Sequence, residues 1–278
     1  MENAKNNTCT RVDRVSSYKV VLFVHLEVLY LDVINILCYY FFSTIYGVFI
    51  EVDDLILDRF WRCRKIVIIL AGMIGVGKTT YTYRLAEELG TQPFFEPVEE
   101  NPILDKYYED PDKYGFALQI YFLNKRFKMI KAAYHDDNNI LDRSIYEDAL
   151  FTYINTLKGS ISEQEYDIYL ELLDNMMEEI QGLPKKAPDL LIYLDGSFDH
   201  IMNNIKKRGR NYEQPNEENG LADYYQLLYK HYQNWYEDYN YSPKMRIATD
   251  DLDIANPNDW NHVYQQIQQK MKTIGLEK

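Results

Sequence analysis

The chain has 278 residues, 46% of them apolar, and a formal net charge of −13. That apolar content is ample for a folded core, so disorder of the whole chain is excluded. The acidic charge argues against a nucleic-acid partner, because phosphate backbones are bound by basic surfaces. The three cysteines form no C-x-x-C or Cys/His group, so no metal or disulfide framework is expected.

The composition changes near Ile66. Residues 1–65 contain all three cysteines and no proline, and their eight basic and eight acidic side chains cancel. The whole net charge therefore belongs to the rest of the chain. We predict an N-terminal extension over residues 1–65 and a catalytic domain over residues 66–278.

Within the extension, Val33 to Ile50 has no charged residue for 18 positions. A membrane span needs about 20 predominantly apolar residues, so this run is borderline, and basic residues on both sides set no orientation. Three interpretations stay open: a membrane anchor, a soluble extension, and an over-extended reading frame whose true start lies later. We favour the third, and we expect a cytoplasmic protein without a membrane span.

Residues 72–80, GMIGVGKTT, have the pattern G-x-x-x-x-G-K-[ST] of a phosphate-binding loop. A predicted strand, Ile66–Ala71, precedes the loop and a predicted helix, Lys78–Leu89, follows it, which is the context that this loop requires. Glycines let backbone N–H groups face phosphate oxygens, Lys78 supplies a cation, and the Thr79 hydroxyl suits Mg²⁺. We predict a nucleoside triphosphate bound with Mg²⁺. The predicted binding residues are Gly72, Met73, Ile74, Gly75, Val76, Gly77, Lys78, Thr79 and Thr80.

Downstream of the loop, strands and helices alternate. Strands are predicted at Gln92–Glu96, Asn139–Asp142, Asp189–Asp195 and Met245–Ala248. Helices are predicted at Tyr114–Tyr134, Ile145–Leu157, Ser162–Gln181, Phe198–Lys207, Leu221–Tyr239 and Pro257–Thr273. This order predicts an α/β fold with a five-stranded parallel sheet, helices on both of its faces, and ligands at the carboxyl ends of the strands.

Two of the predicted strands end in side chains that suit phosphoryl transfer. Glu96 ends the second strand and can accept a proton from an attacking hydroxyl. Asp142 and Arg143 end the third, where the carboxylate can support Mg²⁺ and the guanidinium can neutralise charge on the transferred group. Charged residues of this kind are often simply exposed on the surface of a protein. The place of these three at the ends of predicted strands favours a catalytic role instead.

A basic run, Lys206 to Arg210, stands out in the acidic body and precedes a polar stretch, residues 211–220. A short basic lid over the phosphates would exclude water and bring guanidinium groups to them. By itself such a run is more often a solvated helix end.

Together these motifs resemble those of the deoxynucleoside kinase family, and most of all its bacterial deoxyadenosine/deoxyguanosine kinases. The resemblance spans about Ile66 to Lys270, so it implies a P-loop kinase fold for essentially the whole domain. Five motifs in order carry it: GMIGVGKTT, Glu96-Pro97-Val98, Tyr108-Glu109-Asp110-Pro111 with Gln119, Asp142-Arg143-Ser144, and Arg208-Gly209-Arg210.

The resemblance implies a role for each catalytic position. Glu96 would be the general base for the 5′-hydroxyl, and Arg143 would hold that hydroxyl and the phosphate. Lys78 would act on the triphosphate, and Asp142 would lie near Mg²⁺. The ATP-binding lid arginines would be Arg208 and Arg210.

The same resemblance implies how the deoxynucleoside is held. Tyr108 and Glu213 would bind the 3′-hydroxyl, and Gln119 would hydrogen-bond the edge of the base. Arg126 and Asp148 match a charged pair that lines the base pocket of the deoxycytidine- and purine-directed members.

Two departures from the family pattern concern specificity. Asn204 replaces a basic residue one turn before the lid, so fewer phosphate contacts are expected there. Thr152 stands where several animal enzymes place an aromatic that stacks on the base, and Phe151 or Phe122 can substitute for it.

We predict an ATP-dependent, Mg²⁺-requiring kinase for the 5′-hydroxyl of deoxyadenosine and/or deoxyguanosine, with a deoxycytidine or broad-specificity kinase as the alternative. There are three rival functions. A nucleoside monophosphate kinase would need a further group of basic residues to hold the phosphate of the acceptor. A nucleotide-binding regulatory protein would carry N-K-x-D, whereas residues 124–127 read NKRF. A membrane-tethered P-loop protein is the third rival. The resemblance also implies a homodimer, or a heterodimer with a homologous subunit.

Overall fold

The computed structural model describes residues 66–96, 98, 101–136, 138–182, 187–216 and 219–276. The N-terminal extension lies outside these ranges, and so does the apolar run Val33 to Ile50. The three interpretations of that segment, and the domain boundary at residue 65, therefore stay predictions.

The centre of the fold is a parallel sheet of five strands: β1 (Val67–Ala71), β2 (Gln92–Phe94), β3 (Asn139–Asp142), β4 (Leu190–Asp195) and β5 (Lys244–Ala248). Their order across the sheet is β2-β3-β1-β4-β5, and every pairing is parallel. The predicted five-stranded parallel sheet is confirmed. β1 lies in the middle and is buried along its whole length, so the loop that follows it opens at the centre of the carboxyl edge.

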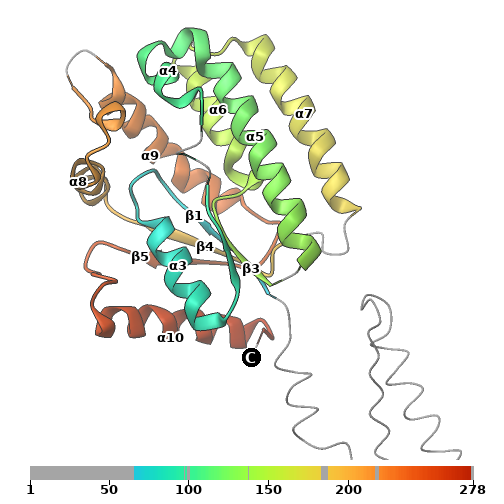
Figure 1. The fold of residues 1–278 in the computed structure, drawn as a ribbon, viewed down its shortest axis with the longest axis vertical. Helices are drawn as coiled ribbons and strands as arrows, with labels where there is room; N and C mark the ends of the chain where they lie inside the picture. The colour runs from blue at the N-terminus through green and yellow to red at the C-terminus, as the bar shows by residue number, and fades with distance from the viewer. Residues whose placement is uncertain are drawn as a thin grey trace, which may run out of the picture. The chain divides into compact units, whose positions relative to one another are not determined.

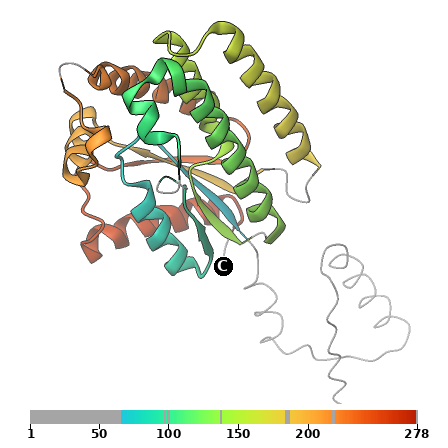
Figure 2. The same ribbon diagram turned by 45° about the horizontal axis from the view of Figure 1, so that its top comes forward.

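Helices form the outer layers. Within the described ranges the α-helices are α3 (Lys78–Leu89), α4 (Leu104–Glu109), α5 (Pro111–Asp136), α6 (Asp148–Leu157), α7 (Glu163–Gln181), α8 (Phe198–Arg208), α9 (Leu221–Asp238) and α10 (Pro257–Thr273), and the 3-10 helices are η1 (Ile145–Glu147) and η2 (Asn211–Glu213). α3 and α10 lie on one side of the sheet, and α5, α6, α7 and α9 lie on the other (Figures 1 and 2). The prediction of helices on both faces is confirmed.

Strand β2 ends at Phe94, two residues before the predicted end at Glu96, and several helix ends differ by one or two residues from the predicted ones. Three larger differences concern the helices. α5 begins at Pro111 rather than at Tyr114, because the fixed φ of proline suits the first turn of a helix. The segment predicted as one helix from Ile145 begins instead with η1 and becomes α-helical only at Asp148. The short helices α4 and η2 were not predicted, because segments of six and three residues show no hydrophobic period.

Gly72 joins β1 to the phosphate-binding loop under two constraints. Its φ is +142°, and a Cβ added there would lie 2.7 Å from the carbonyl oxygen of Leu194 in β4. We expect Gly72→Ala to lower the free energy of unfolding by about 1–3 kcal/mol, because both the dihedral angle and the backbone contact are unfavourable for alanine. Chemical denaturation measures this change.

The matched control is Gly182→Ala. Gly182 has a φ of −78°, and the nearest atom to an added Cβ lies 3.3 Å away. An alanine there is expected to change the free energy of unfolding by no more than about 0.5 kcal/mol. Equal losses in the two variants would contradict this account of Gly72.

Candidate active site

The phosphate-binding loop and the strand ends border a cleft of about 1470 Å³. The cleft is lined by residues 74–80 and by side chains from α4, α5, α6 and α8, including most of the predicted site residues: Glu96, Tyr108, Gln119, Arg126, Asp142, Arg143, Arg208, Arg210 and Glu213. The structure thus brings together, at one edge of the sheet, residues that are spread over nearly 140 positions in the sequence.

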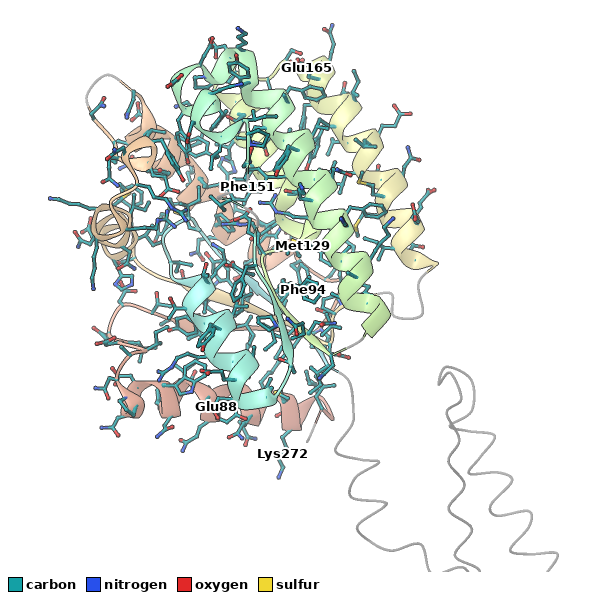
Figure 3. The ribbon with its side chains drawn as sticks, viewed as in Figure 1. Glu88, Phe94, Met129, Phe151, Glu165 and Lys272 are labelled. Carbon is teal, nitrogen blue, oxygen red and sulfur yellow. The ribbon has the colours of Figure 1, made fainter. Side chains whose placement is uncertain are left out.

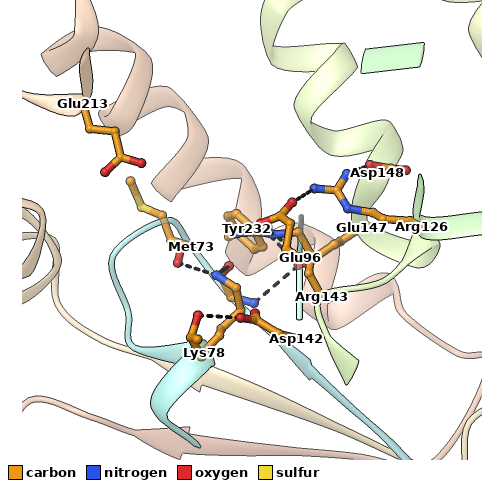
Figure 4. Close-up of polar contacts among 12 residues, drawn as sticks. Met73, Lys78, Glu96, Arg126, Asp142, Arg143, Glu147, Asp148, Glu213 and Tyr232 are labelled. Carbon is orange, nitrogen blue, oxygen red and sulfur yellow. Dashed lines mark hydrogen bonds and ion pairs between the residues drawn. The ribbon is translucent and has the colours of Figure 1, made fainter. Parts of the chain in front are cut away.

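Lys78 lies at the base of the cleft. Its Nζ atom donates to the carbonyl oxygens of Gly72 at 2.9 Å and Met73 at 3.0 Å (Figure 4). Gly77 caps the start of α3 with a left-handed φ of 104°, a conformation that glycine adopts without strain. Burial and the nearby charge of Arg143 lower the pKa of Lys78 to about 8, so the side chain is a cation at pH 7.

Thr79 and Asp142 lie side by side. The Thr79 hydroxyl donates to Oδ2 of Asp142 at 2.5 Å. Oδ1 of Asp142 is buried and has no hydrogen-bond partner within the described residues. Burial raises the pKa of Asp142, and the charge of Lys78 opposes that rise. A hydroxyl next to an unpartnered carboxylate oxygen is a donor set that suits Mg²⁺.

Glu96 is held between two arginines. Its Oε1 atom pairs with Nη2 of Arg126, and its Oε2 atom lies 3.3 Å from Nε of Arg143 (Figure 4). Burial alone would raise the pKa of Glu96, but the charges of Arg126, Arg143 and Lys78 outweigh it and lower the pKa to about 2. The carboxylate therefore stays ionised and able to accept a proton throughout the neutral and mildly acidic range.

This arrangement predicts the pH dependence of the reaction. Glu96 loses its function as a base only when the pH falls through its lowered pKa, so kcat/KM for the deoxynucleoside should show no loss from Glu96 between pH 8 and 5. Replacing Arg126 by methionine removes the largest lowering charge, and the pKa of Glu96 should then rise. In a plot of kcat/KM against pH, the loss of activity toward acidic pH should therefore begin at a higher pH for Arg126→Met than for the wild type, even if the variant is less active at every pH. If the two curves have the same shape on the acidic side, the assignment of Glu96 as the general base is contradicted.

Arg126 also connects Glu96 to Asp148, a predicted site residue that does not itself line the cleft. Its Nη1 atom pairs with Oδ1 of Asp148, which is fully buried. The Arg126 guanidinium lies 4.8 Å from the ring centre of Phe122 and 5.8 Å from that of Phe151. Figure 3 shows Phe151 in the interior, whereas Glu165 and Lys272 lie at the periphery. Both phenylalanines named from the sequence therefore lie beside the charged pair, and the cleft there offers aromatic faces and hydrogen-bonding groups together.

Glu213 is the centre of a second cluster. Arg208 pairs with its Oε2 atom, and Nη1 of Arg210 lies 3.4 Å from its Oε1 atom. Its backbone carbonyl accepts from the Tyr225 hydroxyl at 3.0 Å. Figure 4 shows Glu213 set apart from Glu96 and its arginines. The two arginines that the family resemblance assigns to the lid thus contact the carboxylate that it assigns to the sugar.

Tyr108 and Gln119 lie on the two helices next to that cluster. The Tyr108 ring lies 5.1 Å from the Tyr212 ring, and burial raises the pKa of Tyr108 well above its ordinary value. Gln119 is buried in α5 and lines the cleft. Tyr108 therefore keeps its proton and can donate a hydrogen bond at neutral pH.

Sequence reasoning missed several residues of this site. Tyr107 donates to Oδ1 of Asn155 at 2.7 Å and forms one wall of the cleft. Glu147 and Tyr232 both contact Arg143. Arg143 and Glu147 are four positions apart but do not share a helix, so the rule for helical pairs gives no signal for this contact. Tyr232, 89 positions from Arg143, has no local signal.

These groups supply what phosphoryl transfer needs. A glycine loop with a buried ammonium group suits phosphates, a carboxylate suits an acceptor hydroxyl, and guanidinium groups suit the charge of the transferred group. This combination in one cleft defines a P-loop phosphotransferase.

Comparison with known proteins identifies the family. The sequence model described as "Deoxynucleoside kinase" matches residues 68–272, well over half of the chain. The chain belongs to the deoxynucleoside kinase family and is a deoxynucleoside kinase. Membership implies that it uses ATP and that it binds nucleotides and deoxynucleosides.

Individual relatives agree with this membership. The chain is 52% identical to a deoxyguanosine kinase of Lactobacillus johnsonii over 75% of this chain and 94% of that protein. It is 48% identical to a deoxyadenosine kinase of Lactobacillus acidophilus over 75% of this chain and 98% of that protein. A solved structure, the deoxyadenosine kinase from M. mycoides with bound dATP, matches with a TM-score of 0.63 and 31% identity, over 73% of this chain and 99% of that one.

The possible membrane span was suggested by the N-terminal extension and not by the catalytic domain. Within the described residues, no helix combines the length and the apolar character that crossing a membrane requires. The run Val33 to Ile50 lies outside those residues.

Proposed function

We propose that this kinase phosphorylates the 5′-hydroxyl of purine deoxynucleosides, deoxyadenosine and/or deoxyguanosine, with ATP as the donor. One observation carries the proposal: the Glu96 carboxylate lies between the phosphate-binding loop and the Arg126–Asp148 pair. A nucleoside whose base meets that pair therefore places its sugar next to Glu96. The similarity to a deoxyguanosine kinase and a deoxyadenosine kinase supports the choice of purines.

The reaction is an in-line displacement at the γ-phosphorus. The 5′-oxygen forms the new P–O bond while the bond to the β-phosphate oxygen breaks, and ADP leaves. Glu96 takes the proton of the 5′-hydroxyl, and Arg143 stabilises the charge on the transferred group. Lys78 and the loop amides hold the triphosphate in place.

Mg²⁺ is the proposed cofactor. Thr79 and Asp142 would hold it, since the hydroxyl and the unpartnered Oδ1 atom of Asp142 are oxygen donors at the loop. Mg²⁺ neutralises phosphate charge when it is bound. Within the described residues there is no group of three acidic, histidine or cysteine side chains that could hold a metal, which suits an ion that phosphates also ligate.

The deoxynucleoside would be held at both ends. Tyr108 and Glu213 would bind the 3′-hydroxyl, and Gln119, Arg126 and Asp148 would read the base. Arg208 and Arg210 contact Glu213 in this structure. The same two arginines would therefore serve both the phosphates and the carboxylate that binds the sugar.

A direct assay tests the proposal. The full-length chain is incubated with ATP and Mg²⁺ and each of the four natural deoxynucleosides, and the 5′-monophosphate is quantified. We expect the highest kcat/KM for deoxyadenosine or deoxyguanosine. A higher value for deoxycytidine would select the alternative, because the Arg126–Asp148 pair also occurs in deoxycytidine-directed members. Highest turnover of thymidine would overturn the assignment.

Assembly and location stay predictions. A homodimer, or a heterodimer with a homologous subunit, is implied by the family resemblance, and analytical ultracentrifugation distinguishes either from a monomer. A cytoplasmic location is checked by fractionating cells that express the full chain.

A further inference from the structure

Glu147 is a fully buried carboxylate that contacts three separate segments of the chain. Its Oε1 atom lies 3.2 Å from Nη1 of Arg143, and its Oε2 atom accepts from the Tyr232 hydroxyl at 3.1 Å. Oε2 also lies 3.4 Å from the backbone N–H of Gly72, at the entry to the phosphate-binding loop. One side chain thus ties together the loop after β1, the turn after β3 and helix α9.

The contacts around Arg143 form a closed ring. Nη1 of Arg143 donates to the Tyr232 hydroxyl at 2.7 Å, and that hydroxyl donates to Glu147, which in turn pairs with Nη1 (Figure 4). The guanidinium is buried, and it also lies 4.7 Å from the ring centre of Phe151. A flexible arginine side chain is thereby held at its terminal atoms, while Nε still faces Glu96.

The backbone at Arg143 is held in an unusual conformation. Arg143 has a φ of +74°, and among the described residues it is the non-glycine residue with a positive φ. Its N–H donates to the carbonyl oxygen of Leu70 in β1 at 2.9 Å. Non-glycine residues adopt this region at a cost, and such residues gather where surrounding contacts hold them for function. The ring around Glu147 supplies such contacts.

We propose that Glu147 is a positioning residue, which holds the guanidinium of Arg143 at a fixed place relative to the phosphate-binding loop, with Tyr232 completing the ring. The inference rests on the proposed role of Arg143 at the transferred phosphoryl group. It predicts that damage to the ring slows the chemical step more than it weakens substrate binding, because the groups that contact ATP and the deoxynucleoside stay in place.

Two variants test the ring from different sides. Glu147→Gln keeps the size of the side chain and an oxygen for the Gly72 N–H but removes the ion pair. Tyr232→Phe removes one hydroxyl and leaves the Glu147–Arg143 pair intact. Tyr236→Phe is the matched control, since Tyr236 is buried one turn further along α9 and borders Lys244 and Arg246 instead.

Steady-state kinetics of the full-length chain give the readout. A misplaced catalytic group costs on the order of 100-fold in rate, so we expect kcat to fall about 100-fold in Glu147→Gln. We expect a fall of about tenfold in Tyr232→Phe and none in Tyr236→Phe. KM for ATP and for the deoxynucleoside should stay within about threefold of wild type in all three. Thermal unfolding checks that each variant is folded.

The outcomes separate this inference from the proposed function. An active wild type with equal kcat in Tyr232→Phe and Tyr236→Phe would overturn the inference alone. A rise in KM for ATP at unchanged kcat would also overturn it, because the ring would then serve the loop rather than Arg143. If Glu147→Gln does not fold, Tyr232→Phe decides. A wild type that phosphorylates no deoxynucleoside would overturn the proposed function, and this inference with it.

Discussion

Replacing Glu96 by glutamine is expected to lower kcat by about 10²–10⁴-fold, the usual contribution of a general base. Glutamine has nearly the same shape but cannot accept the proton of the 5′-hydroxyl. The fold should survive, because Arg126 keeps its pair with Asp148 and Arg143 keeps its pair with Glu147. Single-turnover formation of the 5′-monophosphate measures the loss, and equilibrium titration with ATP should give a Kd close to the wild-type value.

Glu171→Gln is the control for this experiment, since Glu171 is an exposed glutamate on α7. We expect it to match the wild type in rate and in ATP affinity. A Glu96→Gln variant that retains more than about a tenth of the wild-type kcat would show that Glu96 is not the base. The proton would then have to leave by another route, and the position of Glu96 between two arginines would need a different explanation.

Lys78→Met is expected to lower kcat/KM for ATP by about 10²–10³-fold, the range found for removing one preorganised electrostatic group. Methionine fills a similar volume but carries no charge. The cation it replaces is buried, and its pKa of about 8 keeps it protonated at pH 7. In a site with little water such a charge acts strongly on phosphate oxygens. Initial rates over a range of ATP concentrations measure the effect.

Lys128→Met is the matched control, because Lys128 is exposed on α5. The same change of residue there should leave kcat/KM for ATP unaltered. A loss confined to the KM for the deoxynucleoside in Lys78→Met would count against the assignment of Lys78 to the triphosphate. The deoxynucleoside KM therefore has to be measured for both lysine variants.

The fold was predictable because its signals are local. The run of apolar residues at Ile66 to Leu70, the glycine loop and the following helical period lie within 25 residues of one another. The observed helices α3 and α10 have the predicted bounds, since Gly90 ends the first and Asn256 with Pro257 begins the second. The predicted helix boundaries were wrong where no such residue marks them, as at Ile145–Glu147, which forms a 3-10 helix.

The site was predictable only where a motif or a strand end marks it. Lys78, Glu96 and Arg143 follow strands of a parallel sheet and Asp142 ends one, and the carboxyl ends of such strands meet at one edge. Arg126 and Asp148 lie within helices and carry no mark of their own, so only the family resemblance singled them out. Their ion pair, together with the contact of Arg126 with Glu96, is a fact of the fold.

The class of this protein follows from its sequence: a parallel sheet, a phosphate-binding loop at its central strand, and a carboxylate and an arginine after neighbouring strands. Which distant charges meet follows only from the packing of the folded chain. Arg143 contacts Tyr232 of α9, and Arg126 of α5 pairs with Glu96 and with Asp148 of α6, because the packing of these helices at the carboxyl edge of the sheet brings the side chains together. Hydrophobic periodicity reports the face that a helix buries, but buried polar partners are chosen by distance and desolvation, which exist only in the folded chain.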